Sequence, residues 1–156
     1  MITLLRGPVG TLPLVERWIS VDDPADGLAL VPHDPVDGGP LCEVRADSGP
    51  ASAPGAFLLM VSFAVPPSGL AQFDDWYDTE HTPLLLAAPS WLRVRRLLAP
   101  DVPAGERNCF VLHELADLQV LDGPERAAAG RAPKRAEVAA LPWYASSRRW
   151  TFTALR

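Results

Sequence analysis

The sequence contains 156 residues, of which 48% are apolar, and its formal net charge is −5. This length is enough for one domain with a hydrophobic core and too short for two complete domains. Lys134 is the single lysine, and five of the thirteen arginines lie in two short groups at 93–96 and 148–149. Because nucleic-acid binding needs clustered basic residues that displace counterions, this composition excludes a general nucleic-acid-binding protein.

The cysteines and the apolar runs indicate the cellular location. Cys42 and Cys109 form no CxxC pair and have no histidine at metal-ligand spacing, so the sequence contains neither a disulfide framework nor a zinc motif. No apolar run is as long as a membrane span, and residues 1–6 lack the basic and apolar regions of a signal peptide. We therefore expect a cytoplasmic protein with reduced thiols and no contact with a membrane.

Residues 1–55 form an N-terminal extension rich in proline and glycine. Its apolar pieces are short, and turn-forming stretches such as 22–24 and 37–40 separate them. We expect two or three short strands and one turn of helix in this region. The small residues of 48–55 (SGPASAPG) are typical of a linker.

Residues 56–156 have a more regular pattern and form the second unit. Residues 57–65 are apolar on both faces of a strand, which is typical of a central strand covered on both sides. Apolar residues at helical spacing then predict a helix over 68–86, with Ser68 as its N-cap. The remaining pattern predicts strands at 91–98, 109–115 and 149–154, and a helix over 121–141 that Pro133 kinks or splits.

The order of these elements is β-α-β-β-α-β, which predicts an α+β fold. Right-handed crossovers then give a ferredoxin-like antiparallel sheet of four strands with both helices on one face. The other face also carries apolar side chains, and a large exposed apolar patch is costly. A second copy of the sheet would cover that face, so we expect a homodimer.

Two motifs carry a resemblance to a known family. The first helix contains FxxWYDxEHxP at 73–83, and the next strand begins with PSWLRxRR at 89–96. Together with the element order, they resemble the EthD-like branch of the dimeric α/β-barrel superfamily, over residues 56–156. The resemblance implies a dimeric α/β barrel, with residues 1–55 as an added extension or a degenerate half-repeat. Members of the superfamily include cofactor-free cyclases of aromatic polyketides, lactone isomerases, monooxygenases and haem-handling proteins.

Tyr77 and His81 are the candidate catalytic residues. With Phe73 and Leu84 they lie on one face of the helix, the apolar face, so their side chains point toward the sheet. A histidine there can exchange a proton near neutral pH, and a phenol beside it can donate a hydrogen bond to an enolate oxygen. A structural role is the open alternative: His81 caps the helix or bonds a strand carbonyl, and Tyr77 belongs to the core.

Other residues of the two motifs and the third strand have candidate roles as well. Asp78 and Glu80 flank the helix face, and either carboxylate can orient the imidazole of His81. His113 and Glu114 point to opposite faces of their strand, so one of them faces the helices. Trp76 lies about 100° round the helix from Tyr77 and is assigned to packing or to the dimer interface.

Arginines at 93–96 offer positive charge to the same region. An inward-pointing arginine can bind a carboxylate or enolate, whereas a cross-strand ion pair with the His113-Glu114 segment is the structural alternative. The predicted substrate-binding residues are Phe73, Asp78, Leu84, Trp91, Arg95 and His113. The three histidines have no metal-ligand spacing, and glycine-rich nucleotide motifs are lacking, so we expect neither a metal nor a cofactor.

These observations predict a cofactor-free cyclase or isomerase that transfers protons on a small aromatic or polyketide-like carbonyl compound. A non-catalytic protein that binds a small molecule or supports an assembly is one alternative. A monooxygenase that works either without a cofactor or with haem is the other.

Overall fold

The computed structural model describes residues 1–8, 16–32, 39–49 and 55–155. The strands are β1 (Ile2–Pro8), β2 (Glu16–Ser20), β3 (Asp26–Pro32), β4 (Leu41–Ser48), β5 (Phe57–Phe63), β6 (Trp91–Leu98), β7 (Cys109–Leu115) and β8 (Arg148–Ala154). The helices are α1 (Leu70–Trp76), α2 (Thr82–Leu86), α3 (Pro124–Arg131) and α4 (Pro133–Ala139). A π-helical turn at Tyr77–His81 joins α1 to α2, and 3₁₀ turns lie at Pro67–Gly69, Leu118–Asp122 and Pro142–Ser146. None of these described helices has the length and apolar composition needed to cross a membrane.

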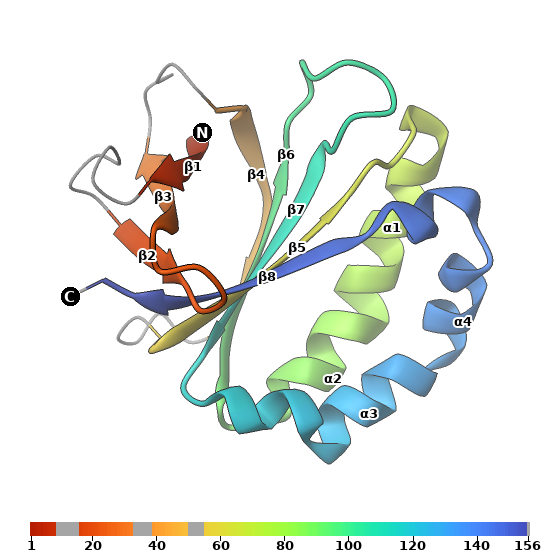
Figure 1. The fold of residues 1–156 in the computed structure, drawn as a ribbon. Helices are drawn as coiled ribbons and strands as arrows, with labels where there is room; N and C mark the ends of the chain where they lie inside the picture. The colour runs from red at the N-terminus through yellow and green to blue at the C-terminus, as the bar shows by residue number, and fades with distance from the viewer. Residues whose placement is uncertain (9–15, 33–38, 50–54, 156) are drawn as a thin grey trace.

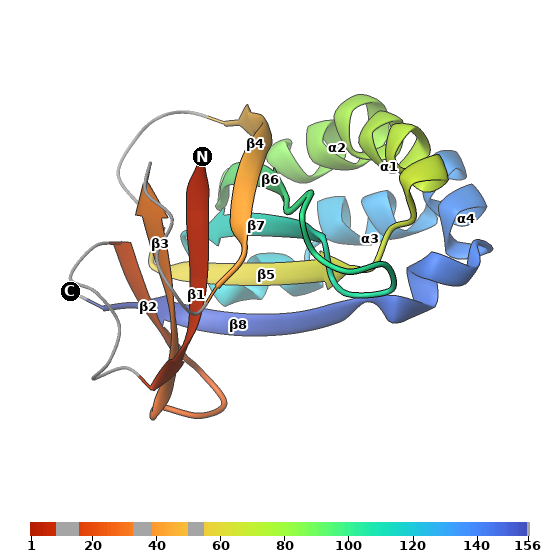
Figure 2. The same ribbon diagram turned by 90° about the horizontal axis from the view of Figure 1, so that it is seen from above.

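The strands close into one antiparallel barrel in the order β1-β3-β2-β8-β5-β7-β6-β4. Figure 1 shows β1, β2 and β3 on one side of the molecule, the helices on the opposite side, and β5 to β8 between them. The view from above in Figure 2 shows the same separation. Strands β5 to β8 therefore have two covered faces, one toward the helices and one toward the barrel interior.

The ferredoxin-like order predicted for residues 56–156 is confirmed. Strands β5 to β8 pair in the order β8-β5-β7-β6, and the two helical segments connect β5 to β6 and β7 to β8 on a common face. The predicted break at Pro133 is also present, since Ala132 before it is extended with φ −67° and ψ 151°. The proline ring disfavours a helical conformation at the preceding residue, which explains why α3 ends there.

The N-terminal residues contribute four strands to the same barrel. Strand β4 pairs with the edge strand β6, and β2 pairs with β8, while β1 and β3 bridge the two additions. The region therefore holds more strand than predicted and no helical turn among its described residues; the predicted linker falls largely outside them. These strands cover the sheet face for which a second copy was expected.

Apolar side chains from both halves fill the barrel interior. Every second residue of a strand points inward, and the inward set of the N-terminal strands meets the inward set of β5 to β8. The buried members of this cluster are Leu4, Trp18, Leu28, Leu30, Cys42, Leu58, Met60, Leu97, Ala99, Phe110, Leu112 and Phe152. Because each large side chain contributes roughly 1.5–3 kcal/mol when buried, the interior ties the two halves together.

A buried ion-pair cluster lies on the interior side of β6 and β7. Arg95 contacts Glu114 at 3.0 Å and Glu16 of β2 at 2.6 Å, and Arg93 lies 3.6 Å from Glu114. The Arg95 and Glu114 side chains are only 6% and 5% exposed. Arg95 therefore forms the cross-strand ion pair, and it lies outside the lining of the cavity on the helix side.

The Glu114→Gln substitution should lower the free energy of unfolding by about 3 kcal/mol, because it leaves the charge of Arg95 buried with one partner fewer. Urea denaturation of the variant and of the parent protein measures this loss. The control is Asp26→Asn, which breaks the more exposed Arg6–Asp26 pair and should cost less than about 1 kcal/mol. Equal losses in the two variants would contradict the assignment.

Candidate functional site

The helical segment over the sheet changes its geometry within the WYDxEHxP motif. Residues Tyr77–His81 form a π-helical turn between α1 and α2. Pro83 follows two residues later, and a proline lacks the N–H that an α-helix needs and clashes with the carbonyl four residues earlier. The wider π turn relieves this conflict, and such turns are frequent at functional sites. Tyr77 and His81 are both buried in this turn, with their rings 5.0 Å apart.

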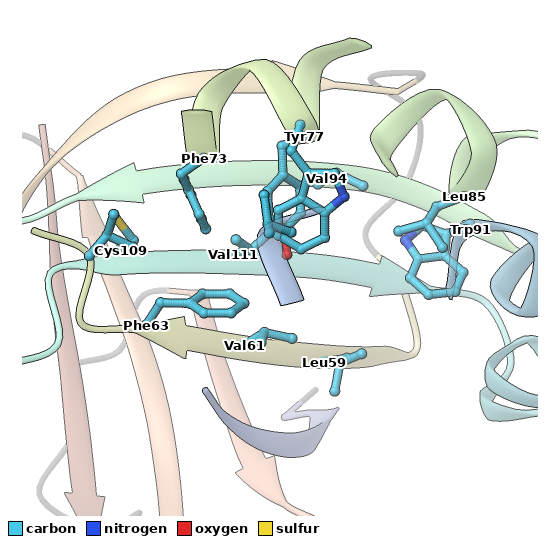
Figure 3. Packing of buried hydrophobic residues seen from close by; sticks show 14 of the residues in the cluster. Leu59, Val61, Phe63, Phe73, Tyr77, Leu85, Trp91, Val94, Cys109 and Val111 are labelled. Atoms are coloured by element: carbon cyan, nitrogen blue, oxygen red, sulfur yellow. The ribbon is translucent and has the colours of Figure 1, made fainter. Parts of the chain in front are cut away.

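A cavity lies between this turn, the second helical segment and the sheet. Its lining consists of Leu59, Val61, Phe63, Trp76, Tyr77, His81, Leu85, Trp91, His113, Arg126, Arg135, Tyr144 and Arg149. Figure 3 shows part of it, with Tyr77 directed from the helix toward the apolar side chains of β5 and β7. The fold thus brings a tyrosine and two histidines, from separate elements, into one largely apolar site.

The cavity has a closed inner part and a partly open mouth. Its histidines, Tyr77 and its tryptophans are buried, whereas Arg126, Arg135 and Tyr144 are partly exposed and Arg149 is exposed. The cavity volume is ≈ 30 Å³. Pockets for drug-sized ligands measure about 300–1,000 Å³, so an aromatic ligand has to displace the side chains at the mouth.

Hydrogen bonds define the state of the two histidines. The indole Nε1 of Trp91 donates to Nδ1 of His113 over 3.2 Å, which leaves Nε2 of His113 to carry the proton. His81 bonds the backbone of Ala129. Nδ1 of His81 and the indole Nε1 of Trp76 are buried without a hydrogen-bond partner in the described structure. Buried polar atoms are nearly always bonded, so this acceptor and this donor mark where a bound molecule or water would bind.

The ionisable groups of the inner cavity are neutral at pH 7. Burial, followed by the charges of Arg126 and Arg135, lowers the pKa of His81 to about 3. Burial and the neighbouring His81 and Arg126 lower the pKa of His113 well below 6.5. Burial also raises the pKa of the Tyr77 phenol above its ordinary value of 10. The site therefore offers neutral hydrogen-bonding groups and one free imidazole lone pair.

Four of the eight predicted site residues line the cavity, namely Tyr77, His81, Trp91 and His113. Phe73 packs against Phe63 and Tyr77 in the core, and Leu84 lies at the core's edge, whereas Leu85 lines the cavity. Trp76, which the sequence assigned to packing, is part of the lining and lies 4.8 Å from the His81 ring.

The motif's two acidic residues support the helices. Asp78 forms an ion pair with Arg96 at 2.5 Å. It does not belong to the cavity lining, so it is not placed to contact a substrate there. Glu80 accepts hydrogen bonds from the backbone N–H groups of Lys134 and Arg135 at 2.9 and 2.8 Å, and so caps the start of α4. Both carboxylates have these partners in place of the expected contact with His81.

Sequence reasoning missed the basic residues at the cavity mouth. Arg126, Arg135 and Arg149 come from α3, α4 and β8, far from the motif along the chain. For Arg149 alone, strand alternation in β8 indicates the position. Trp150 and Phe152 point into the barrel interior, so the adjacent Arg149 points toward the helices.

The described residues offer no ready site for a metal or a large cofactor. No group of three or more His, Cys, Asp or Glu side chains in the described chain is placed to hold a metal ion. The cavity volume of ≈ 30 Å³ is also far smaller than a porphyrin, so the lining residues as they stand do not fit a haem.

Comparisons with known proteins show the fold. No protein-family model matches the sequence, and no curated protein is significantly similar to it. A solved structure of a major regulator of staphylococcal pathogenesis superposes with a TM-score of 0.70 at 10% identity, covering 99% of both chains.

Two solved structures from Listeria monocytogenes have the same architecture. An uncharacterised ferredoxin-fold protein related to antibiotic biosynthesis monooxygenases has a TM-score of 0.64 at 9% identity, covering 99% of this chain and 94% of its own. A haem-degrading enzyme has a TM-score of 0.62 at 11% identity, covering 97% of each chain. The chain thus shares the ferredoxin-like fold of these proteins along almost its whole length.

The buried neutral histidines should make the protein less stable in mild acid. The unfolded chain takes up protons on its histidines below about pH 6.5, whereas folded His81 stays neutral until about pH 3. The free energy of unfolding should therefore fall by about 2 kcal/mol for His81 between pH 7.5 and pH 5, and His113, whose pKa is also lowered, should add to this fall. Urea denaturation at both values tests this fall. It should disappear in the His81→Gln/His113→Gln double variant; a double variant that keeps the full pH dependence would contradict the explanation.

Proposed function

We propose that this protein is an enzyme that binds a small aromatic carbonyl compound in the cavity and removes or relocates a proton on it. The observation that carries the proposal is the pair of buried, unpartnered polar atoms, Nδ1 of His81 and Nε1 of Trp76, within a site of aromatic walls. An acceptor and a donor that the protein leaves unbonded are the groups that a substrate would satisfy.

His81 and Tyr77 have complementary roles in this proposal. The free lone pair of His81 accepts the proton next to the carbonyl group, and the neutral phenol of Tyr77 donates a hydrogen bond to the enolate oxygen that forms. His113, whose Nδ1 is occupied by Trp91, has only Nε2–H to offer and acts as a second donor. Exclusion of water by Trp76, Trp91 and Leu85 strengthens each of these interactions.

The enolate is the common starting point of several reactions. It can close a ring or shift a double bond, as in the cyclases and isomerases of the dimeric α/β-barrel superfamily, to whose EthD-like branch the WYDxEHxP motif bears a resemblance. It can also react with oxygen, which agrees with a fold shared with proteins related to antibiotic biosynthesis monooxygenases. Between these, the shared fold favours the oxidation and the motif favours ring closure or isomerisation.

A second candidate function is binding without turnover. The observation that favours it is the pKa of about 3 for His81, because so weakly basic an imidazole holds an abstracted proton poorly. In this case the protein stores or presents its ligand, and the cavity serves recognition alone.

Turnover of enolisable aromatic ketones distinguishes the two functions. Substrate loss is followed by absorbance and oxygen uptake with an electrode, and the absorption spectrum of the purified protein records any retained haem. Replacing His81 by Gln should slow turnover by about 100-fold or more, and Tyr77→Phe should slow it by a smaller factor.

The control for this experiment is Thr79→Ala, in the same π turn but exposed and outside the cavity lining, which should leave turnover unchanged. Undiminished turnover in the His81 variant would exclude the proposed role of His81. Saturable binding of the ketones without turnover in the parent protein would favour the second function.

A further inference from the structure

The mouth of the cavity concentrates positive charge without matching negative charge. Arg126, Arg135 and Arg149 converge there from three elements, and no carboxylate belongs to the lining. Among the described residues, none of the three forms an ion pair with a carboxylate. Their charges interact: burial, followed by the charges of Arg149 and Arg135, lowers the pKa of Arg126. The repulsion among these like charges raises the energy of the empty site. A bound anion would lower that energy.

Elsewhere in the described chain some arginines pair with carboxylates and others do not: Arg107 and Arg148 donate to backbone carbonyls instead. Arg93, Arg95 and Arg96 all contact carboxylates, as do Arg6 and Arg45. Carboxylates are abundant, with 19 Asp and Glu against 14 Lys and Arg in the chain. What distinguishes Arg126, Arg135 and Arg149 from the other unpaired arginines is that all three line one cavity that has no carboxylate in its lining.

The inner cavity supplies a second, independent sign of a ligand. His81 is 8% exposed, lines the cavity, and its Nδ1 has no hydrogen-bond partner among the described residues. Arg135 stacks over the ring of Tyr144 with 4.3 Å between its Cζ atom and the ring centroid. Aromatic rings thus line the way from the mouth to the histidines, which suits a flat ligand.

We infer that the cavity selects an aromatic or conjugated organic anion, whose carboxylate or phosphate group binds Arg126, Arg135 and Arg149 while its ring enters between Trp76, Tyr144 and the sheet. This inference rests on the proposed function and specifies its substrate class. Guanidinium groups bind such anions through paired N–H donors, which fixes the orientation of the ring relative to His81.

The bound anion also changes the chemistry of the site. The charged groups that face His81 are Arg126 of α3, Arg135 of α4 and Arg149 of β8, and its titratable neighbours are Tyr77, Tyr144 and His113. All the charged groups are positive and disfavour protonated His81. An anion at the mouth offsets them, so it makes His81 a better proton acceptor when the substrate is present.

Calorimetric titration with three probes of one shape tests the inference: naphthoate, naphthyl phosphate and the uncharged naphthamide. We expect at least one anion to bind at least about tenfold more tightly than the amide, because a hydrogen-bonded charge pair is lost with the amide. NMR titration of His81 should show its pKa rising in the complex with the anion.

Matched variants locate the effect. The Arg126→Gln/Arg149→Gln double variant should bind the anion at least about tenfold more weakly and bind the amide unchanged. The control is Arg131→Gln/Arg148→Gln, which removes the same charge from the same two elements, α3 and β8, at exposed positions outside the lining. It should retain the affinity for the anion.

The outcomes separate this inference from the proposed function. Equal affinity for the amide and both anions, or equal weakening by the two double variants, overturns the anion site and leaves the cavity as a binding site for neutral molecules. Turnover of neutral ketones without any binding of the anions also overturns the anion site and leaves the proposed function standing. If no probe binds and no ketone is bound or converted, both the inference and the proposed function are wrong.

Discussion

Two strand pairings join the N-terminal strands to the ferredoxin-like sheet. They determine the organisation of the molecule. Strand β4 extends the sheet at β6, and β2 extends it at β8, so both edges of the four-stranded sheet are paired within the chain. Closure removes free sheet edges, which otherwise invite association with other chains. It also fills the face opposite the helices with apolar side chains. As a result, the candidate site lies on the helix side, where the sheet, a π turn and two helices enclose a cavity.

The position of the cavity explains its electrostatics. Burial against the sheet costs the charged forms of His81, His113 and Tyr77 their hydration, so the inner cavity holds neutral groups. The helix α4, which Glu80 caps, carries Arg135 to the mouth. The WYDxEHxP motif thereby performs two tasks: its ring-bearing residues form the inner wall, and its glutamate fixes the helix that brings charge to the entrance.

Sequence periodicity was enough to predict the ferredoxin-like half. Strand 109–115 and the helix break at Pro133 are found where the pattern placed them, because alternation and proline act locally. The barrel closure was not predictable in this way: the N-terminal strands are short, and their paired residues in β6 and β8 lie 46 (Ser48 to Val94) to 136 (Trp18 to Ala154) positions away in the sequence. The dimer argument started from the correct observation of an apolar face, but the sequence left open whether residues 1–55 complete the barrel or only pack outside it.

Only the parts of the site that lie within a single helix or a single strand could be predicted from the sequence. Tyr77 and His81 share a helix face, and alternation placed either His113 or Glu114 toward the helices; the structure places His113 there. For Arg95 the sequence offered both a substrate contact and a cross-strand ion pair, and for Asp78 it did not reveal the pairing with Arg96, because such charge pairs depend on the tertiary structure. The arginines at the mouth were missed for the same reason, since they meet through the packing of α3, α4 and β8.

The arginines at the mouth add to the effect of burial on His81. Burial first, and then the charges of Arg126 and Arg135, lower the pKa of His81, so an anion that offsets these charges must raise the affinity of His81 for a proton. Coupling of this kind is reciprocal, so a proton on His81 strengthens the binding of the anion by the same factor. An anionic substrate would therefore raise the pKa of His81 and make it a stronger base. With a neutral molecule in the same cavity, the pKa of His81 would stay low. The charge of the ligand, more than its shape, would then decide whether the cavity binds a molecule or also transforms it.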